Sequence, residues 1–284
     1  MGEIVLNVED VSIKYPGRDG LITVVDRVSL SLRAGNSLVI AGESGSGKSM
    51  ICQSLIGIVP GAGQVSGVQI DWRGKNLLDL DEAEWRSVRG SEIAMIFQDP
   101  TAALNPLITI GNQLIDVIRT HKRCTRSQAR ERAIESLKLA GFSEPQQQLR
   151  RYSSQLSGGM RQRVAIALAL SCEPSLIIAD EATSNLDVSI QAKIVKLLYD
   201  LKEKLGLALI FVTHDLSLAA EIGGDLLVMY SGNVVEYGPV QSVLTNPKHP
   251  YTKGLLQSAP TMQSTRDKPL QPHGFVLDKL GTDI

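Results

Sequence analysis

The stretch Gly42–Ser49 limits the folds open to this chain more than any other feature of its sequence. It reads G-x-x-x-x-G-K-[ST] and lies between a short apolar run, Leu38–Ala41, and a segment with helical spacing, Ser49–Ile58, which stops at Pro60-Gly61. Glycines let the backbone curl tightly enough for several N–H groups to point inward at phosphate oxygens. The motif requires the order strand, loop, helix, so this context predicts a phosphate-binding loop rather than a chance glycine turn.

The residues of this loop have separate expected roles toward a chain of phosphates. Lys48 is expected against the β- and γ-phosphates, and the Ser49 hydroxyl is expected to face Mg²⁺. The backbone N–H groups and the positive end of the following helix would bind phosphate oxygens. The candidate binding residues are Gly42, Ser44, Gly45, Gly47, Lys48 and Ser49.

A second candidate element is the acidic pair that follows the apolar run Leu176–Ala179. Asp180 is expected to hold the Mg²⁺ shell, mostly through water, because Mg²⁺ dehydrates reluctantly. Glu181, just past the strand end, is the candidate general base for an attacking water. An acidic pair that merely ends a surface strand is the alternative, and the phosphate loop makes it the weaker one.

Strands and helices alternate along most of the chain, which predicts an α/β fold with a mostly parallel sheet covered on both faces. The segment from Asp99 to about Ser157 instead reads as helices and loops, with a capping box of Thr125 and Gln128 opening a helix that ends at Gly141. Residues beyond Pro260 read as a loosely attached tail. The expected strands are Ile4–Val8, Val11–Tyr15, Val24–Leu32, Leu38–Ala41, Glu92–Phe97, Leu176–Ala179 and Leu207–Val212, and the other expected helices are Arg161–Leu170 and Ser189–Leu205.

Composition excludes several classes of protein. The 284 residues carry a net charge of −1 and a pI of about 6.4, which argues against nucleic acid as the main partner. A basic patch between Arg119 and Arg132 reads as a solvated helix face rather than a membrane or nucleic-acid site. Three widely spaced cysteines suggest neither a zinc site nor a disulfide framework. The start of the chain does not read as a signal peptide, and no apolar run reaches the ~20 residues that span a bilayer.

The stretch Leu156–Gln162, which reads Leu-Ser-Gly-Gly-Met-Arg-Gln, resembles the signature of ABC ATPases. Its Ser-Gly-Gly turn opens a helix and so forms a second expected anion site. The resemblance implies a P-loop NTPase (RecA-like) core over residues 1–98 and 158–240, an inserted α-helical subdomain over 99–157 and an N-terminal antiparallel β portion. It also implies ATP and Mg²⁺ as cofactors, and a head-to-tail dimer with an identical or homologous ATPase subunit. In that dimer Ser157, Gly158 and Gly159 would close over the nucleotide of the other subunit.

Four further family elements fall in order along the chain. Tyr15 resembles the aromatic residue that stacks on adenine, with a core tyrosine as the alternative. Gln98 resembles the Q-loop glutamine, which senses Mg²⁺ and water, and Ser184–Asp187 resembles the D-loop at the dimer interface. His214 resembles the switch histidine that contacts the γ-phosphate and orients Glu181. The resemblance thus implies catalytic roles for Glu181, His214 and Gln98, and metal roles for Ser49, Gln98 and Asp180.

Two stretches resemble the D-type ATPase subunits of dipeptide, oligopeptide and nickel importers. They are Phe97–Pro106 and the C-terminal run Asn246–Leu256, within an extension over 241–284. The resemblance implies two permease subunits docked at Asp99–Pro106, an extracytoplasmic binding protein acting indirectly, and a peripheral place on the cytoplasmic face of the inner or plasma membrane. It does not choose between peptide and nickel cargo. The proline-punctuated stretch could also be only a loop.

Two other classes of protein stay open as alternatives. A soluble ABC ATPase of translation or DNA maintenance would usually join two motors in one chain or carry a long coiled coil. A plain P-loop kinase or GTPase would have no use for Leu156–Gln162. One departure from the family is Ala182, where Asp-Glu-Pro-Thr is usual. Since both carboxylates remain, we expect this change to have a modest effect on rate.

Overall fold

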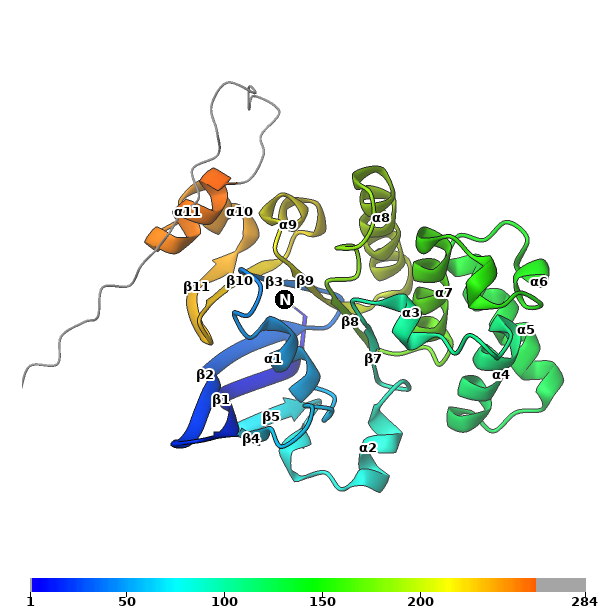
Figure 1. Ribbon diagram of the computed structural model, residues 1–284, viewed down its shortest axis with the longest axis horizontal. Helices are drawn as coiled ribbons and strands as arrows, with labels where there is room; N and C mark the ends of the chain where they lie inside the picture. Colours follow the sequence, from blue (N-terminus) through cyan, green and yellow to red (C-terminus); the bar gives the residue numbers. More distant parts are fainter. Residues whose placement is uncertain (1, 259–284) are drawn as a thin grey trace, which may run out of the picture.

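The computed structural model describes residues 2–258, and these form two sheets with helices around them (Figure 1). The first sheet is antiparallel, with the strand order β2-β1-β5-β6 and β4 paired to β1. Its strands are β1 (Ile4–Gly17), β2 (Gly20–Arg33), β4 (Gln64–Ser66), β5 (Gln69–Trp72) and β6 (Lys75–Asn76). It is the expected N-terminal antiparallel β portion.

The second sheet has six strands in the order β11-β10-β3-β9-β8-β7, and all neighbours pair in parallel except β10 with β11. This order predicts crossover connections that pass through helices on the faces of the sheet. The strands are β3 (Ser37–Ala41), β7 (Ile93–Ile96), β8 (Leu176–Asp180), β9 (Ala208–Thr213), β10 (Asp225–Tyr230) and β11 (Asn233–Pro239). The predicted mostly parallel α/β core is confirmed.

The two faces of this sheet belong to two different hydrophobic cores. Along β3, Leu38 and Ile40 join the core shared with the antiparallel sheet, whereas Val39 and Ala41 join the core shared with the helices. Successive side chains of a strand point to opposite faces, and both faces are covered here, so Leu38–Ala41 is apolar throughout. This explains why β3 after Ser37, and β8 before Asp180, are short continuous apolar runs, with every residue of both strands buried.

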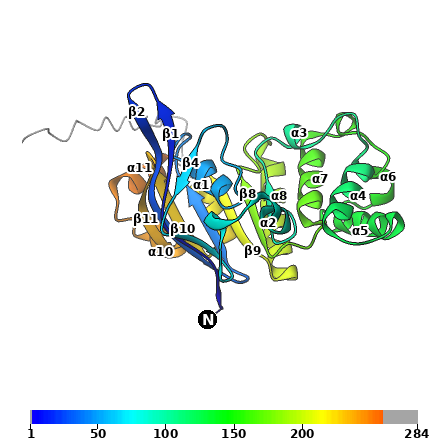
Figure 2. The same cartoon turned by 90° about the horizontal axis from the view of Figure 1, so that it is seen from below.

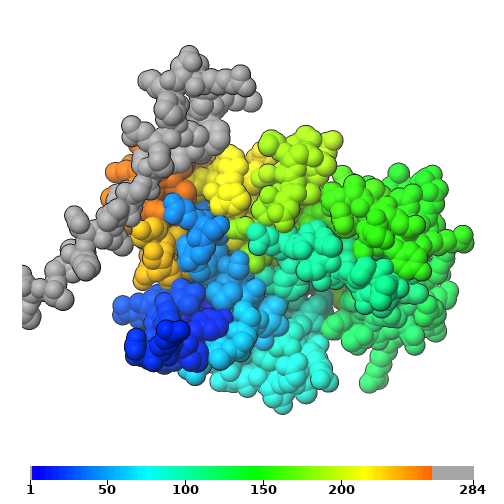
Figure 3. Space-filling model, viewed as in Figure 1, coloured from blue at the N-terminus to red at the C-terminus, as the bar shows by residue number. Residues whose placement is uncertain are grey.

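Helices α3 to α7 form a lobe at the end of the molecule opposite α10 and α11, in views from two sides and in the space-filling view (Figures 1, 2 and 3). Helix α1 lies instead in the core between the two sheets. The helices are α1 (Lys48–Ser54), α2 (Glu82–Val88), α3 (Pro100–Ala103), α4 (Ile110–His121), α5 (Arg126–Leu139), α6 (Pro145–Gln148), α7 (Gly158–Leu170), α8 (Val188–Leu205), α9 (Leu216–Ile222), α10 (Val240–Thr245) and α11 (Pro250–Ser258), with 3-10 turns at Leu77–Asp79 and Ser153–Gln155.

Three expectations about local structure need correction or are left open. The two early strands are one strand, β1, whose pairing with β2 continues through an irregularity between Val8 and Val11. Helix α1 ends at Ser54 rather than near Ile58, because Gly57 takes a φ of +62° and the Ile58 N–H turns back to the Gln53 carbonyl. The predicted tail beyond Pro260 lies outside the described residues.

Candidate functional site

Three neighbouring parallel strands place the candidate polar residues at one edge of the sheet. β3 pairs with β9, and β9 pairs with β8, so their carboxyl ends lie side by side. The phosphate loop follows β3, Asp180 and Glu181 end β8, and His214 follows β9. Ligands of open parallel sheets bind at this edge. The structure therefore brings together residues that lie far apart in the sequence, from Gly42 to His214.

The loop after β3 takes a conformation that only glycine adopts easily. Gly42, Gly45 and Gly47 have φ values of 152°, 80° and 99°, in the region where a side chain strains the backbone. Space is also lacking at the first of these, since a Cβ on Gly42 would lie 2.2 Å from the Met229 carbonyl oxygen. The loop can therefore run against β10 and curl around the end of α1 only with glycine at these places.

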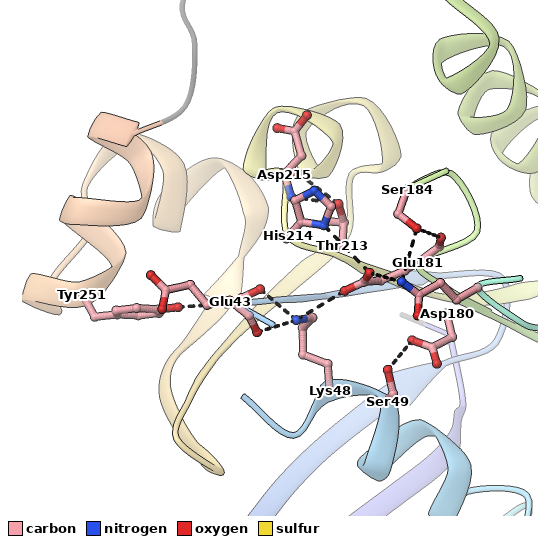
Figure 4. A network of polar contacts seen from close by, with 12 residues as sticks. Glu43, Lys48, Ser49, Asp180, Glu181, Ser184, Thr213, His214, Asp215 and Tyr251 are labelled. Atoms are coloured by element: carbon pink, nitrogen blue, oxygen red, sulfur yellow. Dashed lines mark hydrogen bonds and ion pairs between the residues drawn. The ribbon is translucent and has the colours of Figure 1, made fainter. Parts of the chain in front are cut away.

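Lys48, the first residue of α1, points back into this loop and is only 3 % exposed. Its Nζ donates to the carbonyl oxygens of Gly42 and Glu43, both at 2.8 Å, and lies 3.6 Å from Oε1 of Glu181 (Figure 4). Burial lowers the pKa of Lys48, and the Glu181 carboxylate opposes that shift. The ammonium is thus held in place by neutral acceptors while it faces an acidic group across the pocket.

The Glu181 carboxylate lies close to the side chains of Lys48, Gln98 and His214. Its Oε2 accepts a hydrogen bond from Nε2 of Gln98 at 3.0 Å and lies 3.9 Å from Nδ1 of His214. The residue has a φ of +44°, which costs a non-glycine residue ~1–3 kcal/mol. Its N–H donates to the Val212 carbonyl oxygen at 3.2 Å, and the Ser184 hydroxyl donates to its carbonyl oxygen at 3.0 Å. These bonds fix the strained turn, so the carboxylate is aimed toward the phosphate loop.

Ser49 and Asp180 form a polar pair next to Lys48 and Glu181. The Ser49 hydroxyl donates to Oδ1 of Asp180 at 2.9 Å, and Asp180 is 4 % exposed. Burial raises the pKa of Asp180, and the hydrogen bond from Ser49 opposes the shift. Among residues 2–258 no group of three or more His, Cys, Asp or Glu side chains could hold a metal ion. Two oxygen ligands therefore fit an ion that brings its own waters and phosphate oxygens, as Mg²⁺ does.

Lys48, Ser49, Gln98 and Glu181 line one pocket of ≈ 270 Å³, whereas Asp180 and His214 contact its lining residues Ser49 and Glu181. Its lining residues are Val24, Ser44, Gly45, Gly47, Lys48, Ser49, Met50, Gln98 and Glu181. Tyr15 is half-buried and does not line the pocket, and its hydroxyl donates to the Pro60 carbonyl oxygen at 3.1 Å and lies 3.4 Å from Sδ of Met50, which does line it. Its stacking on adenine stays a prediction.

The Ser157–Gly159 turn is not among the residues that line this pocket. The exposed Ser157 caps the start of α7, accepting from the Met160 N–H at 3.3 Å. Gly159 is buried, and a Cβ there would lie 2.9 Å from Cγ2 of Ile190 in α8. Asp187 caps α8 by accepting from the Ile190 N–H at 3.0 Å. The turn is therefore built against the start of α8 and presents Ser157 outward.

The sequence did not indicate one residue of the site, Tyr251. Its hydroxyl accepts a hydrogen bond from the Glu43 N–H at 2.9 Å, so α11 touches the phosphate loop (Figure 4). The His249-Pro250-Tyr251 run resembles a branch of transporter ATPases, but it does not predict a position beside the phosphate loop.

Residues 25–184 match the ABC transporter family, and residues 235–277 match the oligopeptide/dipeptide transporter, C-terminal region. The first match covers more than half of the chain. This chain is a member of the ABC transporter ATPase family. It is 42 % identical over 266 residues to the oligopeptide transport ATP-binding protein OppD of Bacillus subtilis (strain 168), covering 93 % of this chain and 74 % of that one. It is 41 % identical over 274 residues to the dipeptide transport ATP-binding protein DppD of Escherichia coli (strain K12), covering 96 % and 84 %.

Solved structures agree with this membership. The ABC ATPase superposes on cbiO1 of Clostridium perfringens, described as part of the transporter complex cbiONQ, with a TM-score of 0.74, 27 % identity and coverage of 86 % and 92 %. It superposes on the cassette MJ0796, a dimer in a post-hydrolysis state bound to ADP and Pi, with a TM-score of 0.68, 30 % identity and coverage of 83 % and 98 %. The protein is an ATPase that uses ATP with Mg²⁺. None of its described helices is long and apolar enough to cross a membrane.

Proposed function

We propose that this ABC ATPase supplies the energy for a peptide importer, as a peripheral subunit on the cytoplasmic face of the membrane. The match of residues 235–277 to the oligopeptide/dipeptide C-terminal region carries this proposal, because it sets the chain within one branch of a large family. The names of the relatives, an oligopeptide and a dipeptide transport ATP-binding protein, support peptides over nickel as cargo. They give no support to a role in translation or DNA maintenance.

The chemistry of hydrolysis follows from the groups at the sheet edge. Bound Mg²⁺, held by Ser49, Asp180 and Gln98, would neutralise charge on the phosphates. Glu181 accepts the proton of the attacking water, as its position beside Lys48 and its 11 % exposure suit a shielded base. Gln98 holds the carboxylate oxygen Oε2 by a hydrogen bond, and His214, 3.9 Å from the same oxygen, would help to orient it toward the γ-phosphate. The buried Lys48 ammonium would bind the negative charge that the β- and γ-phosphates carry both before and during hydrolysis.

A second subunit would complete each site. Ser157 is exposed, and Val188, next to the Asp187 cap, is 84 % exposed. An exposed apolar side chain at the start of α8, together with the outward-facing Ser157 at the start of α7, suits an interface more than open water. In a head-to-tail dimer, Ser157, Gly158 and Gly159 would face the triphosphate that rests on the partner's loop. Moving such a dimer from 1:99 to 99:1 closed takes ~5.5 kcal/mol, about half from each nucleotide.

The permease would dock beside Asp99–Pro106. An apolar groove of ≈ 330 Å³ opens next to this stretch. Its walls include Ile56 and Ile58 after α1, and residues of β7, α3, α4 and α7. Phe97 and Ala103 line the groove. Leu107, the residue that follows Pro106, is 85 % exposed. Asp99 caps α3 through the Thr101 N–H at 2.7 Å, so this stretch has a defined shape. These features favour a receptor for a short permease helix over a merely irregular loop.

Reconstitution with two permease chains and candidate binding proteins would test the proposal. We expect a peptide-loaded binding protein to stimulate ATP turnover, and Leu107→Asp to abolish the stimulation. Val68→Asp is the matched control, because Val68 is 64 % exposed but lies at the antiparallel sheet. Co-purification with ribosomes or DNA instead of permeases would support the alternative class. Stimulation by a nickel-loaded binding protein alone would overturn the peptide assignment and leave the importer.

A further inference from the structure

Helix α11 reaches the phosphate loop through the packed side chain of Tyr251. The Tyr251 hydroxyl accepts the Glu43 N–H at 2.9 Å across 208 positions of sequence. The tyrosine is 6 % exposed, and its ring centroid lies 4.5 Å from that of Tyr230, the last residue of β10. Burial raises the pKa of Tyr251, so the group is a neutral hydroxyl at neutral pH. A buried, neutral and packed acceptor has a fixed position relative to the loop.

The peptide group that Tyr251 holds is the one that also holds Lys48. The Glu43 N–H and the Gly42 C=O belong to the same peptide group, which is planar and rigid. Its N–H donates to Tyr251, and its C=O accepts from Lys48 Nζ at 2.8 Å. Fixing the direction of the N–H therefore fixes the direction of the carbonyl. The hydroxyl of α11 and the ammonium of α1 are connected through one rigid unit.

Tyr251 is anchored on β11, away from the loop that it holds. The N–H groups of Lys248 and His249 donate to the Glu236 carboxylate at 2.8 and 3.1 Å. The Tyr251 N–H in turn donates to Nδ1 of His249 at 3.2 Å. Glu236 is part of β11, which pairs with β10. Tyr251 is thus connected to β11 through His249 and Glu236, and its hydroxyl connects the phosphate loop to this strand.

We propose that Tyr251 is a positioning residue for ATP binding, whose hydroxyl holds the Gly42–Glu43 peptide so that Lys48 is presented to the triphosphate. The inference rests on the ATPase activity of the family and not on the proposed cargo or permease. Loss of a single hydrogen bond of this kind changes an equilibrium about threefold to tenfold. Because the lysine contacts the triphosphate both before and during hydrolysis, this loss falls on binding rather than on the chemical step.

The variant Tyr251→Phe keeps the ring and its packing but removes the hydroxyl. In steady-state turnover by the purified full-length chain, we expect the KM for Mg-ATP to rise about threefold to tenfold, with kcat changed less than about twofold. Tyr237→Phe is the matched control, since it removes a hydroxyl that donates to the Ser31 carbonyl oxygen at 3.2 Å, outside the pocket. It should leave both constants unchanged.

An unchanged KM in Tyr251→Phe would overturn the proposal. So would a fall in kcat at constant KM, because a smaller fraction of folded protein gives that pattern. Amide hydrogen exchange of nucleotide-free chain provides a second readout that does not need turnover. We expect the peptide containing residues 42–47 to exchange faster in Tyr251→Phe than in Tyr237→Phe. Equal exchange in the two variants would show that the hydroxyl does not hold the loop.

Discussion

Replacing Glu181 with glutamine isolates the role of its charge, because the two side chains have nearly the same shape. The amide oxygen can still accept from Nε2 of Gln98, now 3.0 Å from Oε2. What is lost is the carboxylate facing Lys48 at 3.6 Å, an attraction of ~5 kcal/mol at an effective dielectric constant of 20. Lys48 is not left unpaired, since it keeps the two carbonyl oxygens of the loop. The pocket should therefore keep its form.

The variant is expected to separate binding from hydrolysis. A positioned general base contributes ~10²–10⁴ in rate, so turnover should fall by at least ~100-fold. That corresponds to ~3–5 kcal/mol of lost transition-state stabilisation. The affinity for Mg-ATP should stay the same or improve, because a negative charge beside the γ-phosphate has gone. ATP should then hold two chains in a closed dimer that does not reopen.

Steady-state phosphate release, equilibrium binding of a fluorescent ATP analogue, and gel filtration with and without ATP would measure the three quantities. Glu221→Gln is a suitable control, because it neutralises an exposed carboxylate on α9 outside the pocket. Turnover above about one tenth of the unchanged protein, against the ~100-fold loss expected of a base, would refute the role given to Glu181. Loss of ATP binding would instead show that the carboxylate is needed for the form of the loop.

Further predictions concern the same sheet edge. Ala182→Pro should change turnover less than about tenfold, because the Ala182 N–H has no hydrogen-bond acceptor within the described part of the chain and the ring removes no bond; a larger change in phosphate release would contradict this. Gly42→Ala should lower the free energy of unfolding by ~1–3 kcal/mol more than Gly20→Ala in denaturant titrations. Both glycines have positive φ, but only at Gly42 would the Cβ meet the backbone of β10, so equal losses would rule out the clash. Ser49→Ala should raise the Mg²⁺ concentration for half-maximal turnover about tenfold or more, since the hydroxyl beside Asp180 is gone; an unchanged Mg²⁺ titration would remove Ser49 from the metal site.

Local patterns in the sequence predict best the elements whose ends are marked by capping or glycine motifs. The helix expected from Thr125 to Gly141 is α5, and both hydrogen bonds of its capping box form. The glycine loop was predicted equally well, because the motif requires particular backbone angles that the three glycines adopt. Strands β10 and β11 were not anticipated, although the apolar run Leu226–Met229 between Gly224 and Gly232 was a usable signal. The break expected in β1 failed because Asp10, at φ +51°, is absorbed as an irregularity in continuous pairing.

The site could be predicted only as far as its motifs reach. The sequence predicts Lys48, Ser49, Asp180, Glu181, Gln98 and His214, and the structure brings them together at the carboxyl ends of four neighbouring strands, β3, β9, β8 and β7. The contact of Tyr251 with Glu43 could not be predicted from the sequence, because it depends on how the segment after α10 packs against β10 and β11. No short pattern encodes such a contact. The contact follows from the order of the strands in the sheet, and this order depends on many residues of the chain together.

The parallel strands of the central sheet contain buried apolar positions along their length and polar functional positions at their carboxyl ends. Along β8, Leu176 to Ala179 are apolar and buried, and the next two positions carry carboxylates. In a library of single substitutions, the first four should tolerate only residues of similar volume, and their failures should show as poor yield of soluble protein. Asp180 and Glu181 should accept many replacements in yield while transport is lost. A growth screen compared with an abundance screen would therefore mark where each strand ends, and would outline the nucleotide pocket without any ligand.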